Sequence, residues 1–322
     1  MELKLIATST SRGLATKISK KIGVPLTKMR HVNFKNGEHL HAPQETLRGC
    51  DVYIIHTFKG VLIDREFMEL LITVRAVKNS AAARLVRVVI PLIPYMRQDR
   101  RTGKREPITA RLIADLIREA GADHVITMDL HSPQEQGFFD ILCDNQSPRA
   151  LFEEHFRPII QKSKKFRVVS PDIGGASKAD TLSEAFGDLG VDPAIIYKRK
   201  VKNGNSNDEI KKMFLLGDVE DADCLLIDDI IDTAGTIKKA AFLLREKGAR
   251  DIYVAATNPL LSGNAKQNLI DANFKEIVIT DSFYIPKRKV LPCFKVLSID
   301  GILADGIIGA HNAKSVQNLV EV

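Results

Sequence analysis

Short apolar runs rich in β-branched residues alternate with longer amphipathic stretches along the whole chain. The short runs predict buried strands, and the longer ones, in which apolar residues recur every three or four positions, predict helices. Strands are expected at residues 3–8, 51–57, 87–92, 124–130, 167–172, 194–198, 224–230, 251–257, 276–282 and 295–299. Helices are expected at residues 67–80, 107–121, 236–249 and 263–274. This order of elements indicates an α/β protein with mostly parallel sheets.

The predicted elements divide into two α/β halves of similar size. A polar segment that ends at Ser147 and Pro148 separates them, so we expect domains at residues 1–147 and 148–322. The last helix of the second domain is a candidate to pack back on the first. In open parallel sheets ligands bind beyond the carboxyl ends of the strands, which places the expected site residues in the turns after the apolar runs.

The composition favours a globular protein that binds small anions. The 322 residues are 44% hydrophobic and carry a formal net charge of +7. Much of the positive charge lies at residues 97–106 and 198–202, each next to a strand-like run, as in a pocket for an anionic substrate. Because the chain has no tryptophan and only five tyrosines, few side chains can stack on nucleic-acid bases, and we expect no nucleic-acid partner.

The sequence also bears on the compartment. It contains no run of about 18 apolar residues, so we expect no membrane span. The first ten residues lack the basic and apolar regions of a secretory signal. The four cysteines are far apart in the sequence, which favours reduced thiols and a cytoplasmic protein.

The turn within residues 224–237 carries the clearest chemical signal. An apolar strand leads into two carboxylates, and a helix follows almost at once. Small residues at a helix start leave backbone N–H groups free to bind an anion, whereas carboxylates suit sugar hydroxyls or a cation. Together they predict a sugar-phosphate site, although Asp232 and Thr233 as simple helix caps are the alternative. No GxxxxGK[ST] string occurs, which excludes a Walker-type NTPase.

Five motifs, taken together, make the chain resemble the ribose-phosphate pyrophosphokinase family, which has the type I phosphoribosyltransferase fold. They occur in the family's order and spacing: FKNGEH at 34–39, RQDRRTGKREPITA at 97–110, MDLHSPQEQGFFDI at 128–141, VVSPDIGGA at 168–176 and LLIDDIIDTAGTI at 225–237. The resemblance implies two tandem phosphoribosyltransferase-like domains. It also implies transfer of the β,γ-diphosphoryl group of ATP to the anomeric hydroxyl of ribose 5-phosphate, giving AMP and phosphoribosyl pyrophosphate.

The same resemblance implies a role for each motif. The residues implied to bind ATP are Phe34, Asn36, Gly37, Glu38, Arg97, Gln98 and Asp99. Those implied to bind ribose 5-phosphate are Asp228, Asp229, Asp232, Thr233, Ala234, Gly235 and Thr236. Mg²⁺ is the implied cofactor, with His131, Asp172 and Asp129 as its candidate ligands, and the implied catalytic residues are Lys198, Arg199, Lys200 and His131.

The chemistry of the residues bears on two of these roles, metal binding and catalysis by the basic loop. Mg²⁺ prefers oxygen ligands, so His131 contacts the metal directly or instead contacts a phosphate oxygen or a metal-bound water. Asp140 and Asp144 are weaker candidates for a second metal, and the other seven histidines show no spacing that predicts a metal site. Residues 197–209 are expected to form a mobile basic loop, from which Lys198 meets the transferred group.

The chain departs from the family's motifs in four places. Lysine stands at position 200 and asparagine at 36, Lys178 and Asp180 replace arginines, and residues 56–67 match poorly. These departures leave a non-catalytic regulatory paralogue as the alternative to an active synthetase. A phosphoribosyltransferase that consumes the activated sugar would leave the N-terminal half without a role. The family resemblance further implies a homo-oligomer, commonly a hexamer.

Overall fold

The chain folds into two compact units. The computed structural model describes residues 1–60, 62–202 and 209–314, without the side chains of 200–202 and 209–211. The first unit holds Met1–Pro148, Asp281–Tyr284 and the chain from Ser298 onward, and the second holds Arg149–Thr280 and Ile285–Leu297. The chain therefore passes between the units four times.

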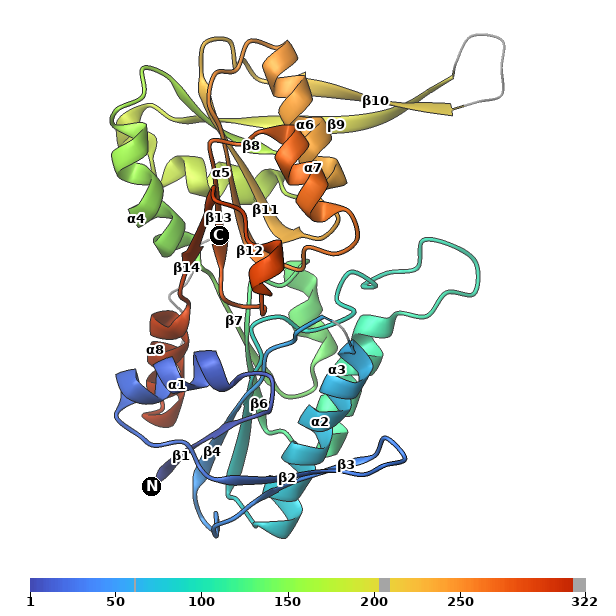
Figure 1. The fold of residues 1–322 in the computed structure, drawn as a ribbon, viewed down its shortest axis with the longest axis vertical. Coiled ribbons are helices and arrows are strands. Elements are labelled where there is room, and N and C mark those ends of the chain that lie inside the picture. Colours follow the sequence, from blue (N-terminus) through green and yellow to red (C-terminus); the bar gives the residue numbers. More distant parts are fainter. Residues whose placement is uncertain (61, 203–208, 315–322) are drawn as a thin grey trace. The chain divides into compact units, whose positions relative to one another are not determined.

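The first unit is built on a parallel sheet of five strands in the order β1-β4-β5-β6-β7 (Figure 1). Their bounds are β1 Leu3–Ala7, β4 Asp51–Ile55, β5 Leu85–Val89, β6 His124–Met128 and β7 Leu142–Gln146. Every residue of β4 and β6 is buried, as expected for strands covered on both faces. Strand β7 lies in the polar segment that we expected to lead into the domain boundary.

Helices and one hairpin complete the first unit. The helices are α1 Arg12–Ile22, α2 Ile63–Arg75 with a π turn at Ala76–Ser80, α3 Thr109–Ala120, a 3-10 turn at Pro133–Phe138, and α8 Asp300–His311. The hairpin pairs β2 Met29–Asn33 with β3 His39–Pro43. Glycines in the left-handed conformation end two of the helices, Gly23 after α1 and Gly121 after α3.

Helix α8 belongs to the first unit although it follows the last strand of the second. It packs beside α1 (Figure 1). Asp281 fixes the start of this segment, because its carboxylate accepts hydrogen bonds from Lys17 Nζ at 2.8 Å and from the Ile299 backbone N–H at 2.9 Å. Gly306 of α8 lies so close to Gln146 that a Cβ there would meet the amide nitrogen at 2.2 Å. The glycine thus permits the close approach of α8 to β7.

The second unit is built on a sheet of seven strands in the order β10-β9-β8-β11-β12-β13-β14. Their bounds are β8 Phe166–Ser170, β9 Asp192–Lys202, β10 Glu209–Leu216, β11 Asp223–Ile231, β12 Ile252–Pro259, β13 Glu276–Thr280 and β14 Phe294–Leu297. All neighbours are parallel except β9 and β10. The predicted α/β class with mostly parallel sheets is confirmed.

Two apolar cores cover the faces of this second sheet. The helices are α4 Arg149–Ile160, α5 Ala176–Glu184, α6 Gly235–Glu246 and α7 Ala265–Ala272, with 3-10 turns at Gly187–Leu189 and Lys287–Lys289. Along β11, Cys224 and Leu226 enter one core, and Leu225 and Ile227 enter the other. This alternation follows from the two-residue period of a strand, and it leaves the carboxyl end of β11 as the place where polar residues can begin.

The basic loop that we expected after residue 196 is a β-ribbon in its described part. Strands β9 and β10 pair in antiparallel fashion, with Lys198 opposite Met213 and Tyr197 opposite Phe214. The rings of Tyr197 and Phe214 stack with centroids 5.1 Å apart. Our loop prediction was wrong for residues 199–202, because a run of cations hid a strand that pairs through its backbone with β10.

Two further observations concern the compartment and the membrane. Each of Cys50, Cys143, Cys224 and Cys293 is a free thiol. Among the described helices, none combines the length and the apolar character that crossing a bilayer requires.

Candidate functional site

The turn between β11 and α6 is shaped to present backbone N–H groups. Ala234 takes the left-handed conformation with φ of 59°, and α6 begins at Gly235 directly after it. The N-cap residue itself, Ala234, makes no side-chain capping hydrogen bond. The first N–H groups of α6 lie at the positive end of the helix dipole, where an anion binds favourably.

Two residues that follow β12 hold this turn in place, Ser262 in the β12–α7 connection and Asn268 in α7. Ser262 donates its backbone N–H to the Asp232 carbonyl at 3.0 Å and its hydroxyl to the Asp232 carboxylate. Asn268 donates its side-chain amide to the Thr233 carbonyl at 2.9 Å. Neither residue was identified from the sequence, because they lie about 30 positions away and carry no motif that we could interpret. They contact the turn only because β11 and β12 are neighbours.

Carboxylates gather at the carboxyl end of β11. Asp229 is buried, and its backbone N–H donates to Asp228 Oδ1 at 2.9 Å. Burial raises the pKa of Asp228 well above its ordinary value, and the hydrogen bond and charge of Asp229, together with the charge of Asp172, raise it further. Since uncompensated negative charge in a buried place is costly, this cluster is suited to a cation or to hydroxyl donors.

Asp172 reaches this cluster from the adjacent strand. It follows β8, which pairs with β11 in parallel, so both strands end at the same edge of the sheet. The loop is held by hydrogen bonds from Ser170 Oγ to the Asp172 carbonyl at 2.5 Å and from the Gly175 N–H to the Asp172 carboxylate at 3.2 Å. A Cβ on Gly175 would meet Ser170 Oγ at 2.8 Å, so this glycine permits the tight turn. The structure thus brings Asp172, a predicted metal ligand, to the predicted sugar site.

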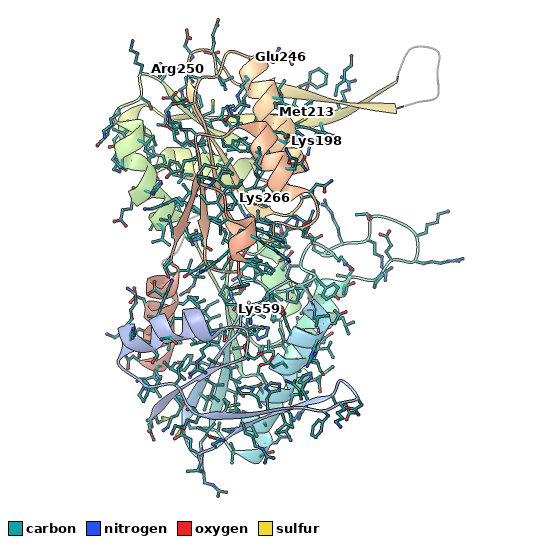
Figure 2. The ribbon with its side chains drawn as sticks, in the orientation of Figure 1. Lys59, Lys198, Met213, Glu246, Arg250 and Lys266 are labelled. Carbon is teal, nitrogen blue, oxygen red and sulfur yellow. The ribbon has the colours of Figure 1, made fainter. Side chains whose placement is uncertain are left out.

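The predicted catalytic cations Lys198 and Arg199 lie on the β9–β10 ribbon of the same unit. Figure 2 labels Lys198. Both side chains are exposed. The backbone of Lys200 continues β9, but its side chain lies outside the described residues. The ribbon presents cations to solvent rather than pairing them in the core, as expected of groups that bind an anionic ligand.

The predicted ATP residues of the first unit divide between a hairpin turn and a loop. Residues 34–38 form the turn between β2 and β3, closed by a hydrogen bond from the Phe34 N–H to the Glu38 carbonyl at 2.8 Å. Gly37 has a φ of 93°, which favours glycine, and Asn36 Oδ1 accepts the Glu38 N–H at 3.2 Å. Phe34 is 48% exposed, so its ring is accessible to a ligand rather than buried in a core.

The loop after β5 carries the other predicted ATP residues. The Gln98 N–H donates to the Tyr95 carbonyl at 2.9 Å, and Gln98 Oε1 accepts the Thr109 hydroxyl at 2.5 Å. Arg97 and Gln98 are exposed, and Asp99 is partly buried. The loop therefore displays a guanidinium group, which can stack on a purine, at the carboxyl end of a parallel strand.

Asp129 and His131 follow β6, the neighbour of β5, so they lie at the same edge of the sheet as the loop of Arg97. Asp129 has a φ of 50°, and its N–H donates to the Gln146 carbonyl at 2.8 Å. His131 is exposed. Asp129 and His131 belong to the first unit and Asp172 to the second.

The two weaker metal candidates are engaged by other side chains. Asp140 accepts hydrogen bonds from Arg111 at 2.7 Å and from Arg118. Asp144 lies 2.8 Å from His124 Nε2. These partners give both aspartates a structural role in the first unit.

The comparisons with known proteins agree with these motifs. Residues 3–121 match the family model described as the N-terminal domain of ribose phosphate pyrophosphokinase, and residues 191–321 match the phosphoribosyl synthetase-associated domain. The chain is 40% identical to the ribose-phosphate pyrophosphokinase of Bacillus subtilis, over 98% of this chain and 96% of that protein. It is 38% identical to ribose-phosphate pyrophosphokinase 1 of Listeria innocua, over 99% and 98% of the two chains.

A solved structure extends the agreement to three dimensions. The phosphoribosylpyrophosphate synthetase of Mycobacterium smegmatis is 35% identical in sequence and superposes with a TM-score of 0.89, over 97% of this chain and all of that one. The likeness therefore extends over nearly the whole chain. The predicted family is confirmed: the chain belongs to the ribose-phosphate pyrophosphokinases.

Proposed function

We propose that this chain transfers the β,γ-diphosphoryl group of ATP to the anomeric hydroxyl of D-ribose 5-phosphate, giving phosphoribosyl pyrophosphate and AMP. The observation that carries the proposal is the β11–α6 turn, in which the start of α6 at Gly235 follows a few residues after Asp228 and Asp229. A phosphate and vicinal hydroxyls on one ligand satisfy both parts of that turn. Membership of the family supplies the reaction.

The second unit is proposed to bind the sugar. The backbone N–H groups of residues 233–236 and the threonine hydroxyls bind the 5-phosphate, because they lie at the positive end of α6. Asp228 and Asp229 accept hydrogen bonds from the ribose hydroxyls. Ser262 and Asn268 keep the turn in its binding conformation through the contacts described above.

The first unit is proposed to bind ATP through the exposed groups on its hairpin and loop. Phe34 and Arg97 contact the adenine by stacking, and the remaining residues of the two motifs contact its polar edge and the ribose. Lys198 and Arg199 on the ribbon meet the charge that develops on the transferred diphosphoryl group. This step needs cations that are free to approach a ligand, and both side chains are exposed.

Mg²⁺ is proposed as the cofactor, with Asp172, Asp129 and His131 as its protein partners. The donor chemistry at Asp172 fits such an ion, because its carboxylate lies near that of Asp228, whose pKa is raised by burial, by Asp229 and by the charge of Asp172. When bound, Mg²⁺ neutralises charge on the phosphates. We further propose a cytoplasmic homo-oligomer, commonly a hexamer in this family. The free thiols support the compartment, and light scattering would test the assembly.

The test is AMP formation from ATP and Mg²⁺ with and without ribose 5-phosphate. We expect AMP only when the sugar is present. A protein that binds ATP but releases no AMP under either condition would contradict the proposal and identify a non-catalytic paralogue. Pyrophosphate release on addition of a nitrogenous base and phosphoribosyl pyrophosphate would instead indicate a phosphoribosyltransferase.

A further inference from the structure

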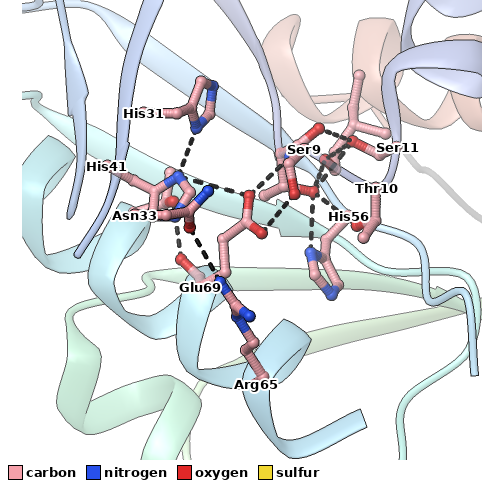
Figure 3. Close-up of polar contacts among 12 residues, drawn as sticks. Ser9, Thr10, Ser11, His31, Asn33, His41, His56, Arg65 and Glu69 are labelled. Carbon is pink, nitrogen blue, oxygen red and sulfur yellow. Dashed lines mark hydrogen bonds and ion pairs between the residues drawn. The ribbon is translucent and has the colours of Figure 1, made fainter. Parts of the chain in front are cut away.

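Three histidines project from one face of the β2–β3 hairpin. His39 and His41 are two residues apart on β3, so their side chains share a face. His31 is the register partner of His41 on β2. Helix α2 supplies Glu69, whose carboxylate reaches the same place from the opposite side (Figure 3). This group, which we call the hairpin cluster, consists of His31, His39, His41 and Glu69, and the proposed reaction uses none of them.

The ligand atoms of the hairpin cluster are separated by distances similar to those between the ligands of one metal ion. His31 Nδ1 is 2.5 Å from His41 Nδ1, and His41 Nδ1 is 3.5 Å from Glu69 Oε1 (Figure 3). One ligand atom from each of these three residues lies within 4.8 Å of the other two. Tetrahedral zinc with nitrogen ligands at about 2.0 Å holds neighbouring ligand atoms about 3.3 Å apart. Side-chain movements on the order of an ångström would therefore bring the three ligand atoms to these separations around an ion.

The carboxylate of the cluster is already oriented by a second layer of contacts. The Ser9 backbone N–H donates to Glu69 Oε1 at 2.6 Å, and the Ser9 hydroxyl donates to Glu69 Oε2 at 2.6 Å. Fixed second-layer partners of this kind orient the ligands in metal sites. Glu69 and His41 are buried, 6% and 5% exposed, whereas His31 is exposed and lets an ion enter from solvent.

His39 adds an unsatisfied group beside the cluster. Both of its ring nitrogens are shielded from solvent, and neither has a hydrogen-bond partner among the described residues. Its ring centroid is 5.1 Å from that of His41. A cavity of about 250 Å³ lies against these side chains. Shielded nitrogens without partners cost free energy, which a ligand or an ordered water in the cavity would recover.

Other histidine–carboxylate pairs in the chain show what a merely structural arrangement looks like. His155 Nε2 lies 2.9 Å from Glu276, and His124 Nε2 lies 2.8 Å from Asp144. Each pair joins one imidazole to one carboxylate, and a single hydrogen bond satisfies it. In the hairpin cluster two imidazole nitrogens face each other, so they share one proton at most. The second imidazole lone pair, which no carboxylate uses, distinguishes the hairpin cluster from a simple histidine–carboxylate pair.

We propose that the hairpin cluster binds one divalent transition-metal ion of the zinc class through His31, His41 and Glu69, with the fourth position open to water or to His39. Imidazole nitrogens with one carboxylate are a ligand set that zinc accepts, whereas Mg²⁺ prefers oxygen alone. The proton between the two Nδ1 atoms moves to Nε2 of the ring that carried it. Both rings stay neutral, and both Nδ1 lone pairs become available to the ion.

A metal at this place would link the β2–β3 hairpin to α2. The hairpin otherwise approaches α2 through side-chain contacts such as the hydrogen bond from Arg65 to Asn33 at 2.9 Å (Figure 3). The turn at residues 34–38 connects the same two strands and directly precedes His39. The ion would therefore restrict the movement of that turn without contacting it.

The test uses the full-length chain, freed of metal by chelation and then titrated with Co²⁺ in the presence of excess Mg²⁺. Every protein carries His131→Ala, so that the predicted ATP-side histidine does not contribute. The matched variants are His31→Ala, which removes an exposed ligand, and His155→Ala, which removes a histidine from a simple carboxylate pair. Visible absorption of the bound Co²⁺ reports nitrogen and oxygen coordination directly and does not depend on activity.

We expect one Co²⁺ per chain in the parent and in His155→Ala, and an affinity at least about 100-fold weaker in His31→Ala. Zn²⁺ at saturating concentration should raise the Tm of the parent by roughly 5 °C and that of His31→Ala by much less. A parent that binds no Co²⁺ would overturn the proposal. So would a His31→Ala variant that binds Co²⁺ with the parent's affinity and spectrum.

Discussion

Asp51 and Asp228 are aspartates in parallel strands of the two sheets, and their surroundings are opposite. Asp51 begins β4, and its buried carboxylate accepts a hydrogen bond from Arg84 at 2.7 Å and one from Arg87 at 3.3 Å. Burial by itself would raise the pKa of Asp51, but these hydrogen bonds outweigh it and lower the pKa. Asp228 lies near the end of β11, where burial and two further carboxylates raise its pKa.

The opposite pKa shifts distinguish a carboxylate that has a structural role, Asp51, from one that is suited to bind a ligand, Asp228. At the amino edge of the first sheet the chain compensates its own carboxylate with two arginines. At the carboxyl edge of the second sheet it places carboxylates together, so the compensation has to come from a cation or from substrate hydroxyls. A buried charge is thus informative mainly through the sign of its neighbours.

The largest expected effect is on turnover, in a variant of Lys198. It tests whether the cations of the β9–β10 ribbon act at the carboxyl edge of the second sheet. Lys198→Ala should lower kcat by about 100- to 1000-fold and leave ATP affinity nearly unchanged, because the lysine meets charge that develops only during transfer. Steady-state kinetics with calorimetric ATP binding would measure both. Lys212→Ala removes an exposed lysine from the other strand of the ribbon and should have little effect. Near-normal turnover in Lys198→Ala would remove the ribbon from the mechanism.

For Asp51 the comparison predicts that a substitution lowers stability without lowering activity. Asp51→Asn should lower the free energy of unfolding by about 2 kcal/mol, because charged hydrogen bonds to two arginines are weakened. Urea denaturation would measure this change. The control is Asp218→Asn, which breaks an exposed pair with Lys165 and should change the free energy of unfolding far less, because water screens exposed pairs. Equal losses in the two variants would contradict the importance that we give to burial.

For Asp228 the comparison predicts a loss of function without a loss of stability. Asp228→Asn should raise the KM for ribose 5-phosphate about tenfold, the effect of losing one good contact of about 1.4 kcal/mol, and leave the KM for ATP nearly unchanged. Without ligands the variant should be slightly more stable than the parent, because one repelling charge is gone. Equal weakening of both substrates, or a clear loss of stability, would refute the placement of Asp228.

The smallest effect is a pH dependence of opposite sign at the two residues. The lowered pKa of Asp51 stabilises the fold above its ordinary pKa of about 3.9, and this stability is lost as the pH falls through the folded-state value. The raised pKa of Asp228 acts the other way, because stability decreases as the pH rises from the ordinary value to the raised one. Each contribution is at most about 1.4 kcal/mol per pH unit.

Denaturation curves of the parent, Asp51→Asn and Asp228→Asn across acidic pH would isolate these terms. The loss of stability as the pH falls should be smaller in Asp51→Asn than in the parent. The loss of stability as the pH rises should be smaller in Asp228→Asn than in the parent. Parallel curves for all three proteins would break the comparison.

Local patterns carried most of what the sequence predicted correctly. The strands, the β11–α6 turn and the five motifs depend on neighbours in sequence, which periodicity and turn chemistry describe well. Ser262 and Asn268 escaped notice because their role depends on β12 lying beside β11. The hairpin cluster escaped for a related reason. Its histidines on β2 and β3 become neighbours only through the antiparallel register, and Glu69 comes from a helix far along the chain.

The ribbon shows a different limit. Strand β9 continues through Lys198 and Arg199, although hydropathy alone indicates a solvated loop there. An exposed strand needs only pairing and a few apolar contacts with its partner, and charged residues permit both. Strand propensity is therefore least visible in the sequence where a strand carries cations for a ligand.

The place of α8 has a consequence for synthesis on the ribosome. Helix α1 is among the first elements to emerge, yet its neighbour α8 is encoded about 280 residues later, after every strand of the second unit. At roughly 5–20 residues per second, the first unit waits on the order of 15–60 s for its last helix. During that interval the face of α1 that α8 covers is open to chaperones. The first unit is thus the first to begin folding and the last to be completed.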